Sequence, residues 1–172
     1  MTSSKPLRAL VVYASRHQGT AEVADVIATE ISGRAIDVTV ASVDDVGSLD
    51  GYDGVILGSA IYMGRWQRSA LDFVDRFVEE LKARPVWLFS SGPIGDPPVP
   101  EGEPQDMLEV EARIGAIEHH VFAGRIEKDG LSRKERVIVR GLRVPEGDFR
   151  DWDDIRNWAV RIGAHLVVHA AA

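Results

Sequence analysis

The sequence predicts an α/β fold in which a parallel sheet of five strands is covered by helices on both faces. Two observations predict it. Short apolar segments alternate along the chain with longer segments in which apolar residues recur every three or four positions, as in a helix with one buried face. Several apolar segments also run directly into loops of small and polar residues. Because 172 residues can bury a core without disulfides or metals, we expect a single domain spanning residues 1–172.

Composition excludes several classes of protein. The chain has no cysteine, which rules out disulfides, iron–sulfur clusters and thiolate catalysis. Its formal net charge is −7, whereas a general nucleic-acid binder is normally basic, so we expect no nucleic-acid partner. Residues 1–6 lack the apolar core of a signal peptide, and no apolar run approaches the roughly 20 residues that span a bilayer. These features predict a cytoplasmic protein.

The first strand is predicted at residues 7–13, whose apolar run is typical of a central strand buried on both faces. A helix follows from Thr20, with Val23 and Ile27 on its buried face and an end at Gly33. Between them lies a polar loop made of Ser15, Arg16, His17, Gln18, Gly19 and Thr20. Hydroxyls, a cation and backbone N–H groups just before the positive end of a helix indicate an anion-binding site.

The middle of the chain continues the alternation. Residues 35–41 are predicted to form a strand near the sheet edge, and residues 54–60 a buried strand. Residues 61–66 are expected to form a loop, which leads into a helix over residues 67–83 that is closed by Pro85.

The last part of the chain contains one more clear strand at residues 86–90, followed by small residues and a proline-rich surface loop at 94–105. A weaker helix is expected over residues 104–117, and a short last strand over 120–125. The final helix, residues 151–168, begins with aspartates that favour a helix start.

Loops of small and polar residues follow three of the predicted strands, after Ala14, Gly58 and Ser90. The carboxyl ends of parallel strands meet at one edge of a sheet, where such folds bind their ligands. One ligand touching all three loops is therefore predicted, since tight turns alone do not require Arg, His and Thr together. The chain has neither a G-x-x-x-x-G-K-[ST] loop nor a G-x-G-x-x-G fingerprint after the first strand, so the first loop is expected to hold a single terminal phosphate.

Two loops and a short tail resemble known motifs. Residues 15–20 resemble the T/S-x-T-G-x-T loop with which the flavodoxin family holds the phosphate of FMN; the family glycine falls on Gln18, and Gly19 is displaced by one position. Residues 58–66, GSAIYMGRW, resemble the G-[AS]-[SA]-I-x-x-G pattern of the flavodoxin-like menaquinone-dependent protoporphyrinogen IX dehydrogenases, as does the tail at 147–152. The resemblance implies a flavodoxin-like three-layer αβα sandwich with strand order 2-1-3-4-5.

The same resemblance implies a site for FMN, bound without covalent attachment. The loop at residues 15–20 would hold the phosphate, and the isoalloxazine would pass along Ser59, Ala60, Ile61, Tyr62, Met63 and Gly64. On the other side of the ring would lie Ser91, Gly92, Pro93 and Ile94. Tyr62 and Trp66 are candidates for stacking on the ring, but Trp66 fits an anchor for the next helix equally well. Met63 fits either a ring contact or core filling.

The function implied is an FMN-dependent oxidoreductase resembling protoporphyrinogen dehydrogenase, with a quinone-type acceptor or another redox partner. Two alternatives stay open: a flavodoxin-type electron carrier without substrate chemistry, and a regulatory FMN-binding module. No side chain stands out as a catalytic acid or base. No metal site is expected, because His119 and His120 are adjacent and have no evident carboxylate cluster as partner.

The residues from Arg125 to Arg143 form a basic segment in an acidic chain. Seven basic and three acidic residues give it an excess of four positive charges. The basic residues are Arg125, Lys128, Arg133, Lys134, Arg136, Arg140 and Arg143. Ser132 and Glu135 have the spacing of a capping box for a short helix. The segment is either a solvated helix face or a surface for an anionic substrate, an acidic partner or a membrane, and its lack of bulky aromatic residues weakens the membrane alternative.

Overall fold

A parallel sheet lies at the centre of the fold, with its strands in the order β2-β1-β3-β5-β6. These strands are β1 (Leu7–Ala14), β2 (Ile36–Ser42), β3 (Gly54–Tyr62), β5 (Val86–Ser91) and β6 (Glu118–Phe122). When only the five parallel strands are numbered, β5 and β6 become the fourth and fifth strands. The predicted order 2-1-3-4-5 is therefore confirmed. The structure is a computed structural model that describes residues 5–32, 36–92, 102–141, 143 and 146–171.

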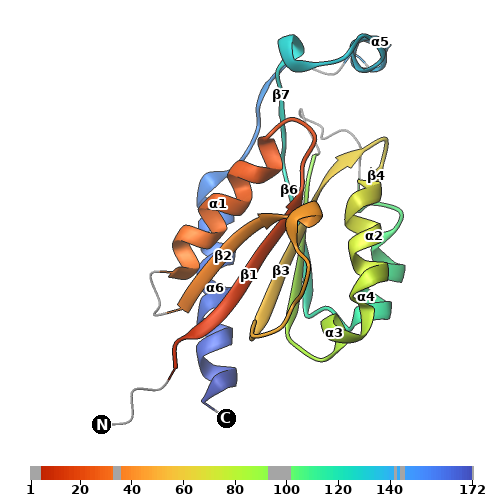
Figure 1. Cartoon of the computed structure of the whole chain (residues 1–172). Helices are drawn as coiled ribbons and strands as arrows, with labels where there is room; N and C mark the ends of the chain where they lie inside the picture. The colour runs from red at the N-terminus through yellow and green to blue at the C-terminus, as the bar shows by residue number, and fades with distance from the viewer. Residues whose placement is uncertain (1–4, 33–35, 93–101, 142, 144–145, 172) are drawn as a thin grey trace.

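Helices cover both faces of the sheet and complete the predicted three layers (Figure 1). On one face lie α1 (Gly19–Ser32) and α6 (Trp152–Ala170), which pack against each other. On the other face lie α2 (Arg68–Arg76), α3 (Val78–Lys82) and α4 (Met107–Ile114), with the 3-10 turn η1 (Val43–Asp45) beside α2. Gly33, the predicted end of the first helix, lies outside the described residues.

Alternate residues of the strands point into two separate apolar cores. Leu10 and Leu57 face the core under α2 to α4, where Phe73 is buried. Val11 and Ile56 face the core under α1 and α6. Both faces of the central strands are therefore buried, which explains why their sequences are continuous apolar runs rather than alternating patterns.

The region between β3 and α4 departs from the prediction in two places. Residues 61–66 are not a loop: β3 continues to Tyr62, and the chain turns back at once as β4 (Arg65–Trp66), antiparallel to β3. Met63 and Gly64 form the turn with φ of 50° and 75°, the left-handed values that a two-residue hairpin turn requires. The helix predicted over 67–83 is interrupted at Phe77, whose φ of −115° and ψ of 21° are not helical.

Later boundaries also differ from the prediction. The weaker helix is shorter than residues 104–117 and ends where Gly115 adopts the left-handed conformation, with φ of 64°. The predicted strand over 120–125 is wrong in its bounds, because β6 begins at Glu118 and ends at Phe122, and Gly124 separates it from the next strand. Among the described residues, none of the helices is both long and apolar enough to cross a membrane.

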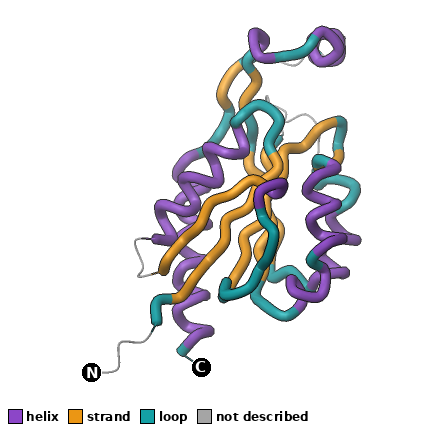
Figure 2. The backbone as a smooth tube through the Cα atoms, viewed as in Figure 1, coloured by secondary structure: helices purple, strands orange, loops and turns teal. Residues whose placement is uncertain are grey.

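The described residues between Arg125 and Asp148 form an outer segment that projects beyond the carboxyl ends of the sheet strands (Figures 1 and 2). It contains β7 (Arg125–Ile126) and β8 (Gly147–Asp148), which pair antiparallel, the 3-10 turn η2 (Lys128–Gly130) and α5 (Arg133–Gly141). The predicted capping box is confirmed: the backbone N–H of Ser132 donates to Glu135 Oε2 at 2.8 Å, and that of Glu135 donates to Ser132 Oγ at 3.3 Å.

Candidate functional site

A pocket of about 510 Å³ lies at the carboxyl ends of β1, β3 and β5, and the outer segment closes one side of it. Its volume is in the range of small-molecule and cofactor sites. The three strand-end loops meet here, as predicted. Twelve of the predicted site residues line the pocket: Ser15, Arg16, His17, Gly19, Thr20, Ala60, Ile61, Tyr62, Met63, Gly64, Ser91 and Gly92.

The first loop presents polar groups at the start of α1. Ser15 Oγ is buried and has no hydrogen-bond partner among the described residues. Thr20, in the first turn of α1, is 3% exposed and lines the pocket. Buried hydroxyls are normally satisfied, so the unpaired Ser15 hydroxyl beside a helix N-terminus fits an anionic ligand.

Gln18 has a backbone conformation that favours glycine. Its φ is 64°, in the left-handed region where a residue other than glycine is disfavoured by about 1–2 kcal/mol. The backbone carbonyl of Gln18 accepts from Glu22 N at 3.0 Å and so belongs to the start of α1. The Gln18 side chain is exposed and does not line the pocket. Gln18 therefore contributes to the predicted site only through its backbone, which shapes the loop.

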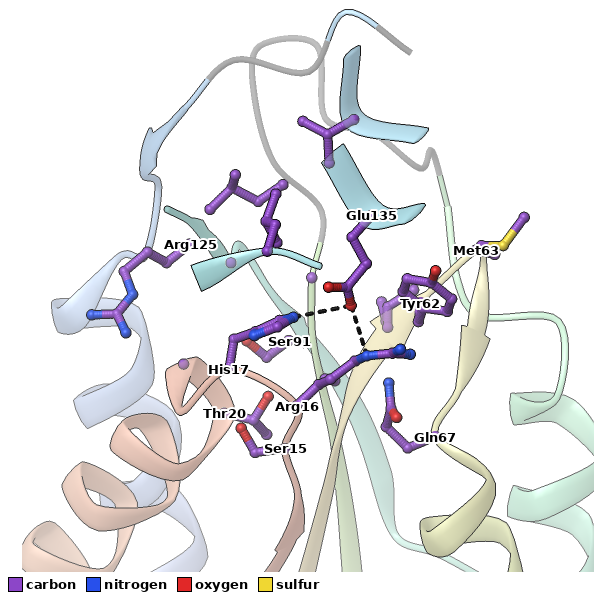
Figure 3. Close-up of a pocket in the computed structure, with 18 of the residues that line it drawn as sticks. Ser15, Arg16, His17, Thr20, Tyr62, Met63, Gln67, Ser91, Arg125 and Glu135 are labelled. Carbon is purple, nitrogen blue, oxygen red and sulfur yellow. Dashed lines mark hydrogen bonds and ion pairs between the residues drawn. The ribbon is translucent and has the colours of Figure 1, made fainter. Parts of the chain in front are cut away.

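Arg16 and His17 both meet one carboxylate of the outer segment (Figure 3). Glu135 Oε1 lies 2.7 Å from Arg16 Nε and 3.1 Å from His17 Nε2. The Glu135 side chain is 5% exposed. Burial acts to raise its pKa, but hydrogen bonds from Ser132 and His17 outweigh burial and hold the pKa of Glu135 at about 2. The carboxylate is therefore ionised at neutral pH.

The second loop supplies a wall of the pocket through Ala60, Ile61 and Tyr62. The Arg16 guanidinium lies 4.4 Å from the centre of the Tyr62 ring, a cation–π contact that closes the corner between the first two loops. Met63 is 70% exposed at the hairpin turn, so it does not fill the core. In Figure 3 its side chain extends away from the groups around Glu135.

Ser59 and Trp66 have structural roles. Ser59 does not line the pocket; its Oγ donates to the Ala60 carbonyl and accepts from Gln67 N, both at 2.9 Å, just before α2. The Trp66 ring is buried, and its Nε1 donates to Ser90 Oγ at 2.7 Å. Of the two interpretations of Trp66, the anchor is correct, because a ring held in the core cannot stack in the pocket.

The third loop contributes Ser91 and Gly92. A side chain at position 92 would collide with Ile61, since a Cβ there would lie 2.7 Å from the Ile61 Cβ. Glycine thus allows the second and third loops to approach each other. The other predicted residues of this loop, Pro93 and Ile94, lie outside the described residues.

Sequence reasoning missed the far wall of the pocket. Leu131, Ile138 and Val139 of the outer segment line it, together with Ile126 and Arg125 of β7 and with Gln67, Gln105 and Gly124. The basic composition of this segment was a signal for binding, but nothing in its pattern showed that aliphatic side chains of α5 face the pocket.

The adjacent histidines enter two separate networks. His119 Nε2 lies 2.7 Å from Ser90 Oγ, and His120 Nε2 lies 2.9 Å from Asp154 Oδ2. Each histidine thus has a carboxylate nearby, because Glu103 Oε1 lies 3.7 Å from His119 Nδ1. Within the described part of the chain, no three His, Asp or Glu residues form a group that could hold a metal.

The fold and the pocket define a doubly wound α/β domain with a ligand site where its parallel strands end. The flavodoxin domain family matches residues 10–153, and the chain belongs to this family. No curated protein matches the sequence significantly.

Solved structures show the same fold. An archaeal flavodoxin superimposes with a TM-score of 0.63 at 19% identity, over 93% of this chain and 99% of that one. Flavodoxin 1 from Bacillus cereus gives 0.60 at 21% identity, over 94% and 98%. Rubredoxin oxygen:oxidoreductase from Desulfovibrio gigas gives 0.69 at 12% identity, over 98% of this chain but only 38% of that larger protein.

FMN is the cofactor of the flavodoxin family, and the described residues fit it. The unpaired Ser15 hydroxyl, the Thr20 hydroxyl and the positive end of α1 suit a phosphate. The remainder of the pocket is mostly apolar, which suits a flat ring system. The chain is thus a flavodoxin-domain flavoprotein with a redox role.

Proposed function

We propose that this flavodoxin-domain protein is an FMN-dependent oxidoreductase resembling the protoporphyrinogen IX dehydrogenases, with a quinone-type acceptor. The observation that carries the proposal is the composite pocket, in which polar groups from the first loop lie opposite aliphatic side chains from α5. The outer segment adds a wall to the pocket and so offers room for a substrate beside a cofactor. Bound FMN would supply the redox chemistry, which this chain's own side chains do not.

Each loop has a proposed role in holding the cofactor. Ser15, Arg16, His17, Gly19 and Thr20 bind the phosphate through hydroxyls, cations and backbone N–H groups. Ala60 to Gly64 line one side of the ring, and Ser91 and Gly92 the other. Pro93 and Ile94, which lie outside the described residues, are assigned to that second side. Ser59 positions the second loop rather than touching the ring, because its hydroxyl is used within the loop.

The basic residues of the outer segment support an anionic substrate. The whole chain carries −7, so the excess of four positive charges in residues 125–143 is a local reversal of sign near the pocket. A substrate with a flat apolar body and carboxylates, such as a porphyrinogen with its propionates, matches aliphatic walls with a basic rim. The same charges also suit an acidic redox partner.

Two measurements test the proposal. Extraction of the purified protein should release FMN rather than FAD, because the first loop has no dinucleotide fingerprint; FAD as the sole species would contradict it. Anaerobic spectra should then show bleaching of the flavin when a porphyrinogen is added, and quinone should restore the oxidised spectrum.

An electron carrier is the second candidate, favoured by the family and by whole-length similarity to small flavodoxins. A carrier should be reduced by a flavodoxin reductase and show no change with a porphyrinogen and any quinone. These two results together would contradict the enzyme proposal and favour the electron carrier.

Charge reversal separates the two roles of the outer segment. Changing Arg133, Lys134, Arg136 and Arg140 to Glu should reduce turnover while FMN affinity changes little, since these side chains do not line the pocket. Exposed charges are screened over about 10 Å at 0.1 M salt, so wild-type turnover should fall as salt rises and the variant should respond less. Activity that ignores both changes would mean that the basic residues are only a solvated face.

A further inference from the structure

Glu135 is an acidic side chain placed against a loop that is built to bind an anion. It lies in the first turn of α5 but turns inward, toward Arg16 and His17 (Figure 3). Its Oε1 meets both side chains, at 2.7 Å and 3.1 Å, and its Oε2 accepts from Ser132 N. The carboxylate is almost fully buried. Its charge is thus compensated by the two residues that the proposed function assigns to the cofactor phosphate.

A phosphate and this carboxylate cannot both use the same two side chains at full strength. The contacts are strengthened because the Glu135 side chain is 5% exposed, and the same low polarity makes two neighbouring anions repel each other. The hydrogen bonds from Ser132 and His17 hold the pKa of Glu135 at about 2, so an incoming phosphate meets an ionised carboxylate at neutral pH. One of the two anions must give way.

Of the two elements that meet here, α5 can move more easily than the first loop. Residues 15–20 join β1 to α1, both packed in the core, whereas Glu135 is the only residue of α5 that is buried among those described. Val137, two residues further along α5, is 71% exposed. The helix itself is kept by its capping box, which does not involve the first loop.

We propose that Glu135 is an internal substitute for the cofactor phosphate: it pairs with Arg16 and His17 and is exchanged for the phosphate when FMN binds. This inference rests on the proposed function, in that FMN must bind in this pocket. The exchange frees α5 from the first loop, so that loading of the cofactor opens the aliphatic wall made by Ile138 and Val139. The exchange also makes Glu135 a specificity-determining residue, because riboflavin, which lacks the phosphate, cannot displace it.

Binding to a charge-neutral variant tests the exchange. Glu135→Gln removes the internal anion, and glutamine can still complete the capping box. FMN should bind about tenfold more tightly to this variant, the effect of removing one charged competitor, while riboflavin affinity should change less than about twofold. Glu127→Gln is the matched control, since Glu127 carries the same charge in the same segment but is 66% exposed and pairs with Arg125. Unchanged or weaker FMN binding by Glu135→Gln would overturn the exchange.

Movement of α5 is measured separately. Because the chain has no cysteine, Val137→Cys and Leu108→Cys place two nitroxide labels at exposed positions on α5 and α4. Addition of FMN should lengthen or broaden the distance distribution between the labels, and riboflavin should leave it unchanged. The same labels with Glu135→Gln should show the broad distribution without ligand. A Leu108→Cys, Val168→Cys pair, which does not include α5, should not respond.

The outcomes separate this inference from the proposed function. Quenching of FMN fluorescence by the unlabelled protein reports binding independently of the labels. Bound FMN with an unchanged label distance would overturn the exchange and leave the function standing. An absence of FMN binding would overturn both.

Discussion

The central sheet and the outer segment are held in place by different forces. Strands β1, β3 and β5 are buried on both faces between two apolar cores. The outer segment has a short antiparallel pair, β7 and β8, and is fastened largely by charges. Arg150 donates from Nη1 to Glu22 Oε2 and from Nη2 to Asp148 Oδ2, both at 2.6 Å, and Glu135 joins α5 to the first loop.

This difference teaches how one pocket can combine a rigid floor with an adjustable wall. Apolar burial does not depend on pairing of charges and contributes about 25 cal/mol per Å², so the strand-end loops are carried by the most stable part of the molecule. Ion pairs depend on their partners and on the charge of a ligand. The wall can therefore respond to a charged cofactor without disturbing the floor.

The largest effect is expected from Trp158→Ala in the core. Trp158 is fully buried against Phe89 and Phe122, with ring centres 6.1 Å and 5.5 Å away, so truncation should lower the free energy of unfolding by about 3–5 kcal/mol. Val137→Ala in α5 should change it by less than about 0.5 kcal/mol. Urea denaturation of both variants checks this. Similar losses in the free energy of unfolding of the two variants would contradict the difference between the core and the outer segment.

Arg150→Met should loosen the outer segment. The guanidinium is 3% exposed, but Glu22 and Asp148 are each more than a third exposed, so we expect a loss near the lower end of the range of about 1.5–3 kcal/mol for charged hydrogen bonds. The hydrogen bond from Arg150 lowers the pKa of Asp148, and that pKa should rise toward its ordinary range in the variant. Carboxyl NMR titration and hydrogen exchange of β8 measure both effects. Arg156→Met, at an exposed pair, should cost less than about 1 kcal/mol.

Thr20→Ala acts on the floor of the pocket without disturbing the fold. Loss of a hydroxyl bonded to a charged phosphate costs about 1.5–3 kcal/mol, so FMN affinity should fall more than tenfold while the unfolding curve stays near that of wild type. Thr29→Ala provides the control, because Thr29 lies on the same helix, is exposed, and bonds only to the Asp25 carbonyl. Unaltered affinity of Thr20→Ala in fluorescence titration would place the phosphate elsewhere.

The smallest effect concerns pH. Burial lowers the pKa of His119 below its usual 6.5, an effect that Glu103 partly offsets. The unfolded chain then binds the proton more readily, so stability is fully present above about pH 6.5 and declines as the pH falls below that value. His119→Gln should flatten this decline in denaturation curves between pH 5 and 7, whereas His169→Gln at the exposed end of α6 should not. Glu135, with a pKa of about 2, should keep α5 attached throughout this range.

Strand positions followed from the sequence because a strand buried on two faces needs an uninterrupted apolar run. The predicted strand at 54–60 corresponds to β3 for this reason. The break at Phe77 could not be predicted, because the apolar spacing of residues 67–83 suits one continuous helix. Phe77 is buried beside Phe73, with ring centres 4.9 Å apart, and its non-helical φ and ψ appear only in the tertiary structure.

The site was predictable where a loop follows a strand, and not where a side chain has two possible partners. Trp66 suits a cofactor ring or a core equally well, and only the position of Ser90 on the neighbouring strand decides between them. For Gln18, the family pattern identified a position where the family has glycine, and the structure shows that the backbone has a positive φ at this position.

By itself the sequence determined the order of strands and helices, the position of the polar loop between β1 and α1, and the local reversal of charge in residues 125–143. These features depend on neighbours within a few positions. Only the tertiary structure decided that Glu135 faces inward, since the capping box with Ser132 is satisfied whether α5 points to solvent or to the pocket. Its pairing with His17 joins residues 118 positions apart, and such a contact depends on how the crossovers bring the outer segment back over the sheet edge.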